Sequence, residues 1–369
     1  MRQYLPLTDI VASLPPTVPF VGPETLARRS GRPLQVRIGA NESPFGVSPV
    51  AAAVMRRAID DLWMYNDPEA HELVEALAAY HAVAVSALHV GAGIDEILGD
   101  LVRIAANPGE TVVMPLGSYP TFAYHVSGYG ARLVEVPYVQ DHVDLPGLAA
   151  AAQAEGARIV YLANPDNPMG TWRPADDVLR LLDELPNDCM LILDEAYADF
   201  APAAAMGPME TRDPRFVRTR TFSKAHGMAG ARVGYAITHN EVVVALNRIR
   251  NQFGVNRVAQ VGATASLGDT EHVAHVVREV EVGRAEYVAL AAELGLGHIE
   301  SATNFVNIDL GSGARARATL AGLLERDVFV RMPGKPPGDR CVRVTVGTPK
   351  QRLDFAEAFR ETLKDLAAA

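Results

Sequence analysis

The sequence predicts an α/β protein with a large domain built on a doubly wound, mostly parallel sheet and a smaller α+β domain. Short apolar segments alternate with helical patterns between about residues 110 and 237, which is typical of parallel strands joined by helical crossovers. The chain of 369 residues is long for one ordinary core, so a second domain is expected. We therefore predict an N-terminal arm that joins the small domain at 1–44, a large domain at 45–255 and a small domain at 256–369.

Composition and charge argue against several classes of function. The formal net charge of −10 disfavours a nucleic-acid partner, which would require a basic face. Apolar residues make up 49% of the chain, yet no uninterrupted apolar segment is long enough to span a membrane, and the N-terminus lacks a signal-peptide core. We therefore expect a cytoplasmic protein. Ten histidines occur without HExxH spacing and two cysteines without a CxxC pair, so no metal site is expected.

The first part of the chain begins with an arm and then becomes helical. Residues 1–35 are rich in proline and glycine, which predicts an arm that lies over another part of the protein rather than a helix or a strand. A short strand follows at 36–38 and enters a polar turn that contains Asn41. The ordinary interpretation of this asparagine is a turn residue that caps its own backbone. Helical patterns then cover 49–58 and 69–83.

Five apolar segments separated by helical patterns predict strands of the sheet: 110–115, 133–137, 157–163, 191–194 and 233–237. Ligands of such sheets bind beyond the carboxyl ends of the strands. Polar groups stand at three of these ends, namely Asn167, the pair Asp194 and Tyr197, and Lys224. A long helix at 272–294 is expected to connect the two domains.

One segment places an amine, two hydroxyls and a guanidinium close together in the sequence. It is Thr221-Phe222-Ser223-Lys224-Ala225, followed by Gly230-Ala231-Arg232. Most lysines are solvated surface charges, and Lys224 taken alone would be interpreted in that way. Its apolar neighbours favour loss of the ammonium proton, which makes the amine a nucleophile able to form a Schiff base. The hydroxyls and Arg232 are suited to bind a phosphate. The combination fits an aldehyde cofactor that carries a phosphate.

Two further segments complete this interpretation. Gly91-Ala92-Gly93 precedes a helix, whose free backbone N–H groups can bind a phosphate, although such a turn alone is only a weak signal. A third glycine and a downstream acid are lacking, so the dinucleotide-binding fingerprint is not matched. Asp194 ends an apolar strand, where a buried carboxylate can keep a pyridine nitrogen protonated. The plain alternative is that Asp194-Glu195 caps the next helix.

These motifs, in this order from Asn41 to Gly347, resemble those of fold-type I pyridoxal-phosphate enzymes, specifically class I/II aminotransferases and their histidinol-phosphate aminotransferase branch. The resemblance implies pyridoxal 5'-phosphate as the cofactor and Lys224, Asp194 and Tyr197 as catalytic residues. Lys224 would bind the cofactor aldehyde and then move a proton at the substrate Cα. The implied cofactor-binding residues are Gly93, Ile94, Asp95, Tyr119, Asn167, Asp194, Tyr197, Thr221, Ser223, Lys224 and Arg232, together with Tyr65.

Some positions depart from the family pattern or extend it. Gly117-Ser118 replaces the usual Pro-Thr before Tyr119, the residue that the family stacks on the cofactor ring, and Phe122 is the competing ring. Met169 stands where threonine is usual in the Asn-Pro-Thr-Gly turn. Tyr65 matches a tyrosine that crosses a dimer interface to the phosphate of the neighbour's cofactor. The resemblance therefore implies a homodimer.

The implied substrates are an amino donor and a 2-oxo acid acceptor such as 2-oxoglutarate. Arg343 lies between apolar residues in a predicted strand, where an unpaired guanidinium is costly, and the family uses this arginine to bind a carboxylate. Arg331 resembles the arginine that reaches the distal phosphate of histidinol phosphate; a surface arginine is the alternative. Phe20 and Phe253 stand where that branch has tyrosines, which is compatible with an aromatic or other apolar amino acid. The predicted substrate-binding residues are Asn41, Phe20, Phe253, Asn256, Arg331 and Arg343.

The reaction type has alternatives as well. The resemblance favours transamination between histidinol phosphate and 2-oxoglutarate, with an aromatic or other apolar amino acid as the alternative donor. Decarboxylation, as in threonine-phosphate decarboxylases, and racemisation pass through the same carbanion and share these motifs. A non-catalytic regulatory domain is the remaining alternative, but such regulators carry a basic winged-helix segment, which is not found before Asn41.

Overall fold

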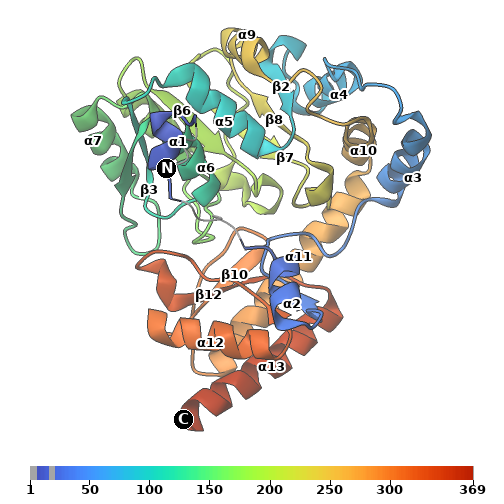
Figure 1. Ribbon diagram of the computed structural model, residues 1–369, viewed down its shortest axis with the longest axis vertical. Coiled ribbons are helices and arrows are strands. Elements are labelled where there is room, and N and C mark those ends of the chain that lie inside the picture. The colour runs from blue at the N-terminus through green and yellow to red at the C-terminus, as the bar shows by residue number, and fades with distance from the viewer. Residues whose placement is uncertain (1–5, 16–20, 369) are drawn as a thin grey trace.

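A seven-stranded sheet organises the larger part of the molecule (Figure 1). The structure, a computed structural model, describes residues 6–15 and 21–368. The strand order is β2-β8-β7-β6-β5-β3-β4, and neighbours run parallel except at β8, which is antiparallel to β2 and β7. The predicted α/β class with a mostly parallel sheet is confirmed. The strands are β2 (Leu88–Gly91), β3 (Thr111–Pro115), β4 (Arg132–Val136), β5 (Ile159–Ala163), β6 (Met190–Asp194), β7 (Phe216–Thr221) and β8 (Gly234–Ile237).

Both faces of this sheet are buried, which explains why its central strands are nearly continuous apolar segments. In β5, Ile159 and Tyr161 pack into one apolar cluster, whereas Val160 and Leu162 pack into the cluster on the opposite face. The first face is covered by α5 (Ile94–Ala105), α6 (Pro120–Gly128) and α9 (Asn240–Ile249), and the second by α7 (Leu145–Glu155) and α8 (Ala175–Glu184). Since β5, β6 and β7 are parallel, the loops after them meet at one edge of the sheet.

Three helices pack together beside β2 and β8, namely α3 (Pro49–Ala58), α4 (His71–His81) and α10 (Arg257–Gly268). The predicted small domain, which starts at residue 256, includes α10. In the structure Ala259 and Ala263 of α10 share an apolar cluster with Leu73 of α4, because the small residues of α10 let it pack closely against the large domain. α10 therefore packs with the helices beside the large sheet, and α11 (Thr270–Glu293) follows it.

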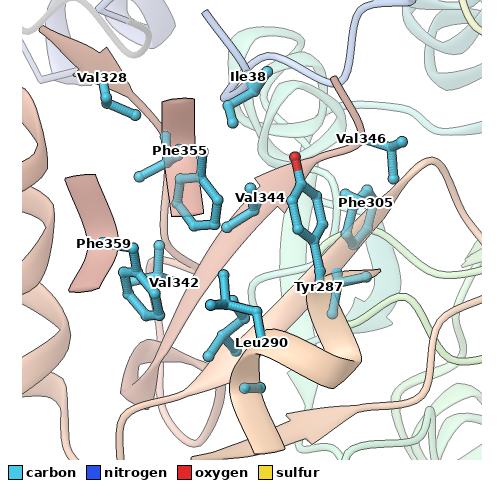
Figure 2. Close-up of a cluster of buried hydrophobic side chains, with 14 of the residues drawn as sticks. Ile38, Tyr287, Leu290, Phe305, Val328, Val342, Val344, Val346, Phe355 and Phe359 are labelled. Atoms are coloured by element: carbon cyan, nitrogen blue, oxygen red, sulfur yellow. The ribbon is translucent and has the colours of Figure 1, made fainter. Parts of the chain in front are cut away.

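The small domain is an antiparallel sheet covered by long helices. Its strands, in the order β12-β10-β9, are β9 (Gly297–Ile299), β10 (Phe305–Asp309) and β12 (Cys341–Thr345). The helices are α11, α12 (Gly313–Glu325) and α13 (Pro349–Ala368). Figure 2 shows the core between them, formed by Phe305, Val342, Val344, Tyr287, Leu290, Phe355 and Phe359.

The N-terminal arm contains two short helices, so the prediction of an arm without helices was wrong. They are α1 (Asp9–Ser13), which lies near α6, and α2 (Pro23–Ser30). Pro23 occupies the first turn of α2 and Gly31 ends it with a left-handed backbone, so the proline and glycine that suggested an arm without helices mark helix boundaries instead. After α2, β1 (Val36–Arg37) pairs in parallel with β11 (Val328–Phe329) and ties the arm to the small domain.

Short 3-10 helices occur at Ile59–Asp61, Val85–Ala87, Ala198–Phe200, Ala203–Ala205, Ala229–Ala231 and Gly338–Arg340. Within residues 6–15 and 21–368, no helix combines the length and the apolar character needed to cross a lipid bilayer. In the same part of the chain, no three His, Cys, Asp or Glu side chains are grouped so that they could hold a metal ion.

Candidate active site

Lys224 stands in the loop after β7, at the carboxyl edge of the sheet. Its Nζ donates a hydrogen bond to the carbonyl oxygen of Asn41 at 2.9 Å and lies over the Tyr197 ring, 5.5 Å from the ring centroid. Burial, aided by the positive charge of Arg343, lowers the pKa of Lys224 from 10.5 to about 8. An amine with this pKa is a ready nucleophile and base near neutral pH.

A group of residues suited to bind an anion lies next to this lysine. We call this group the anion cup; its members are Gly93, Ile94, Thr221, Ser223 and Arg232. Gly93 precedes α5 with φ 87°, and no side chain caps that helix, so its first backbone N–H groups are free to bind a ligand. The φ of 87° at Gly93 is strained for any residue with a side chain, and a Cβ atom there would lie 2.4 Å from Arg232 Nη2 and displace that guanidinium. The Thr221 and Ser223 hydroxyls are 2.9 Å apart, and Arg232 Nη1 donates to Ser223 Oγ at 3.5 Å.

Asp194 ends β6 and its carboxylate is buried, with 5% of the residue exposed. Oδ2 accepts a hydrogen bond from the Tyr161 hydroxyl at 2.8 Å, and Oδ1 accepts one from the Ala196 backbone N–H at 2.9 Å. Burial raises the pKa of Asp194 to about 6, although both hydrogen bonds act in the opposite direction. A buried carboxylate held in this way can pair with a protonated ring nitrogen.

Tyr197 and Asn41 form a buried pair beside Lys224. The Tyr197 hydroxyl accepts a hydrogen bond from Asn41 Nδ2 at 2.8 Å, and burial raises the pKa of this tyrosine to about 12. Asn41 has a left-handed backbone (φ 56°), which asparagine tolerates better than most residues. In this conformation Asn41 forms two hydrogen bonds at the site. Its side chain donates to the Tyr197 hydroxyl, and its carbonyl oxygen accepts from Lys224 Nζ.

The structure distinguishes the two candidate stacking rings, Tyr119 and Phe122. The Tyr119 hydroxyl donates to Asp95 Oδ1 at 2.6 Å, and Asp95 Oδ2 lies 3.8 Å from Arg232 of the anion cup. Phe122 is fully buried and stacks on Tyr161 in the core, with ring centroids 4.3 Å apart. Of the two rings, therefore, Tyr119 lies at the site, and Phe122 supports the sheet beneath it.

Arg331 and Arg343 occupy opposite positions on paired backbone segments of the small domain. The Arg343 guanidinium donates to Asn167 Oδ1 at 2.6 Å and lies over the Phe305 ring, and burial lowers its pKa. Arg331 Nη2 donates to the Val21 carbonyl oxygen at 2.8 Å; burial and the charge of Arg343 lower its pKa to about 10. Asn167, in the loop after β5, thus holds Arg343 of this arginine pair.

A separate cavity of about 470 Å³ has His226, of the Lys224 loop, in its lining. Its polar lining residues are Tyr80, Asp199, Arg220, His226 and Thr270, and none of the predicted cofactor or substrate residues lines it. We therefore assign the site by the convergence of the groups described above and not by this cavity.

Comparison with known proteins gives the family of the chain. The family model for aminotransferase class I and II matches residues 34–359. The chain belongs to this aminotransferase family. It is 38% identical over 367 residues to the histidinol-phosphate aminotransferase of Roseiflexus castenholzii, with 97% of each chain covered. The enzyme of the same name from Symbiobacterium thermophilum is 35% identical, with 96% of this chain and 97% of that one covered.

Solved aminotransferase structures share the fold of the chain. The crystal structure of histidinol-phosphate aminotransferase from Sinorhizobium meliloti, in complex with pyridoxal 5'-phosphate, has a TM-score of 0.96 and 42% identity over 99% of each chain. An aspartate aminotransferase mutant from Thermus thermophilus has a TM-score of 0.78 at 23% identity, with 98% of this chain and 100% of that one covered. The predicted fold-type I class is thus confirmed.

For three predicted residues of this aminotransferase, Tyr65, Phe253 and Asn256, the structure gives contacts away from Lys224. Tyr65 is 80% exposed, and its ring packs against Phe253, which is 46% exposed. Asn256 caps α10, because its Oδ1 accepts from the Ala259 N–H at 2.8 Å while its Nδ2 donates to the Ala231 carbonyl. These bonds give Asn256 a structural role that its prediction as a substrate residue did not include. Phe20 lies outside the residues that the structure describes.

Sequence reasoning missed several polar residues that support the site of this aminotransferase. Asn304 Nδ2 donates to the Asn41 carbonyl at 3.1 Å, next to Lys224 Nζ. Asp166 is buried beside Asn167 and accepts hydrogen bonds from the Tyr138 hydroxyl and the Met169 N–H; burial raises its pKa to about 7. Asp166 could have been predicted from the sequence, because it lies within the Asn-Pro-Asp-Asn-Pro segment that holds Asn167. Asn304 lies far along the chain and had no such signal.

Proposed function

We propose that this protein is a pyridoxal 5'-phosphate-dependent aminotransferase that transfers the amino group of histidinol phosphate to a 2-oxo acid. The observation that carries the proposal is the convergence, at one edge of the sheet, of a lysine of lowered pKa with an anion cup and a buried carboxylate. Near-full-length relatives named histidinol-phosphate aminotransferase support the choice of substrate.

The residues of the site fit pyridoxal 5'-phosphate. The anion cup, in which the backbone at position 93 favours glycine, would hold the phosphate. Asp194 would pair with the ring nitrogen, Tyr119 would cover the ring face, and Asn167 and Tyr197 would bind the ring hydroxyl. Lys224 would bind the aldehyde carbon. When bound, the cofactor supplies an electron sink for the electron pair that the substrate Cα releases.

Lys224 would also carry the proton in both half-reactions. Once free of the aldehyde, its Nζ removes the proton from Cα of the amino donor, and in the second half-reaction it returns a proton to Cα of the oxo acid. The pKa of about 8 suits both directions, because the ammonium and neutral forms are both populated near neutral pH. The Asn41 carbonyl oxygen, 2.9 Å from Nζ, holds the amine in place.

Substrate selection would rest on the two arginines. Arg343 would bind the α-carboxylate of the oxo acid, because the planar guanidinium matches the planar carboxylate in geometry. Arg331, on the neighbouring segment, would bind the distal phosphate of histidinol phosphate. Burial and the positive charge of Arg343 lower the pKa of Arg331, so an anion bound between the two arginines would relieve the repulsion that Arg331 experiences.

We also propose a homodimer in the cytoplasm. Trp63 and Tyr65 are 82% and 80% exposed, and Phe253 packs on Tyr65, so the loop between α3 and α4 presents an aromatic surface. A second copy of the chain is the partner that would bury it, with Tyr65 reaching the anion cup of the neighbour.

The two buried free cysteines suit a reducing compartment.

A panel of amino donors tests the function. The protein loaded with pyridoxal 5'-phosphate is mixed with histidinol phosphate, phenylalanine or glutamate, and the visible absorbance of the cofactor is followed with and without 2-oxoglutarate. We expect histidinol phosphate to give the largest kcat/KM, with glutamate formed in equal amount. A wide preference for phenylalanine would instead favour the aromatic alternative that Phe253 raised, and release of carbon dioxide would indicate a decarboxylase.

A further inference from the structure

Tyr161 is a tyrosine in the middle of β5 whose hydroxyl reaches the proposed cofactor site. Its side chain has 0% exposure, and its ring stacks on Phe122 of α6 with 18° between the ring planes. Phe122 is itself fully buried, so the tyrosine ring is clamped between α6 and the sheet. A ring held in this way keeps its hydroxyl in one position at little further entropic cost.

The hydroxyl of Tyr161 is one of two hydrogen-bond donors to the Asp194 carboxylate among the described residues. It donates to Oδ2 at 2.8 Å, while the Ala196 backbone N–H donates to Oδ1 at 2.9 Å. Each carboxylate oxygen is therefore fixed by one donor and keeps a further lone pair for a ligand. Burial disfavours the charged form of Asp194, and these two bonds favour it.

We propose that Tyr161 is a positioning residue, which holds the Asp194 carboxylate oriented and charged for the ring nitrogen of the bound cofactor. The inference rests on the proposed function, because Asp194 needs this orientation only if a pyridine ring binds there. Tyr161 does not reach the substrate in this assignment. It acts through Asp194, and its contribution is expected mainly in cofactor affinity and in the turnover of bound substrate.

Tyr161→Phe isolates this contribution. Phenylalanine keeps the ring and its stacking on Phe122, and it removes only the oxygen atom that bonds Asp194. Loss of a hydrogen bond to a buried charged group is expected to weaken pyridoxal 5'-phosphate binding by about tenfold or more. The value of kcat should fall as well, with KM of the amino donor nearly unchanged, because a less firmly charged Asp194 would leave the ring nitrogen less fully protonated and the cofactor a weaker electron sink.

The matched control is Tyr235→Phe. Tyr235, in strand β8 of the same sheet, is also buried, and its hydroxyl forms a hydrogen bond with His81 Nε2 at 2.8 Å instead of with a site residue. Both variants lose one buried tyrosine hydroxyl, so thermal unfolding of the two apo-proteins measures the shared structural cost. The dissociation constant of pyridoxal 5'-phosphate, titrated into apo-protein and read from its absorbance, should change only in Tyr161→Phe.

A double-mutant cycle with Asp194→Asn completes the test. If Tyr161 acts through Asp194, then adding Tyr161→Phe to Asp194→Asn should change the dissociation constant by much less than it does in the wild type. Equal effects in both backgrounds, or wild-type affinity and turnover in Tyr161→Phe, would overturn the inference while leaving the proposed function intact. Failure of the wild-type protein to bind pyridoxal 5'-phosphate would overturn both.

Discussion

Replacing Arg343 by alanine should separate the two half-reactions of the proposed enzyme. The guanidinium is held by Asn167 Oδ1 at 2.6 Å and by the Gly39 carbonyl oxygen at 3.4 Å. Among the described residues no carboxylate forms an ion pair with it, and burial lowers its pKa, which indicates a desolvated charge without a counterion. A substrate carboxylate would supply that counterion.

The size of the effect follows from this geometry. Truncating one partner of a desolvated charge pair costs about 2–5 kcal/mol. Because about 1.4 kcal/mol corresponds to a factor of ten, kcat/KM for 2-oxoglutarate and glutamate should fall roughly 30- to 5,000-fold. Histidinol phosphate has no α-carboxylate, so its half-reaction should lose much less.

The assay is rapid mixing of each substrate with the matching form of the cofactor-loaded protein, so that each half-reaction is observed alone. Arg331→Ala serves as the crossed control, because it should depress kcat/KM for histidinol phosphate far more than for phenylalanine. If Arg343→Ala slows histidinol phosphate as strongly as 2-oxoglutarate, the assignment of the two arginines to different anions is wrong. The same conclusion follows if Arg343→Ala leaves 2-oxoglutarate unaffected.

Three further predictions concern the cofactor. Lys224→Ala should abolish the visible absorbance band and the borohydride-dependent labelling of the 221–232 peptide in mass spectrometry, whereas Lys350→Ala, at a lysine 82% exposed, should retain both. The rate of covalent cofactor binding to apo-protein should rise with pH around a midpoint near 8 rather than 10.5, because only the neutral amine of Lys224 reacts and burial lowers its pKa; a midpoint above 10 would contradict the buried setting. Tyr65→Phe should weaken cofactor retention in a protein that sediments as a dimer, and a fully active monomer would exclude a role of Tyr65 in the neighbouring site.

The sequence alone determined the local pattern of the large domain and the chemistry of the Lys224 segment. The helix predicted at 49–58 is α3, and the strand predicted at 157–163 contains β5, because apolar periodicity is a local property that survives in the fold. Lys224, Asp194 and Asn167 were likewise predicted as site residues from their place at strand ends. Parallel strands carry such residues to one edge whatever the details of packing.

Only the tertiary structure decided which distant groups complete the site. The hydrogen bond between Lys224 and the Asn41 carbonyl oxygen joins residues 183 positions apart in the chain. Arg331 and Arg343 lie opposite each other only because their two backbone segments pair. The choice of Tyr119 over Phe122, and the bond from Tyr161 to Asp194, depend on which face of an element is buried and against what. Register and packing of this kind arise from contacts between segments far apart in sequence, which a local pattern does not contain.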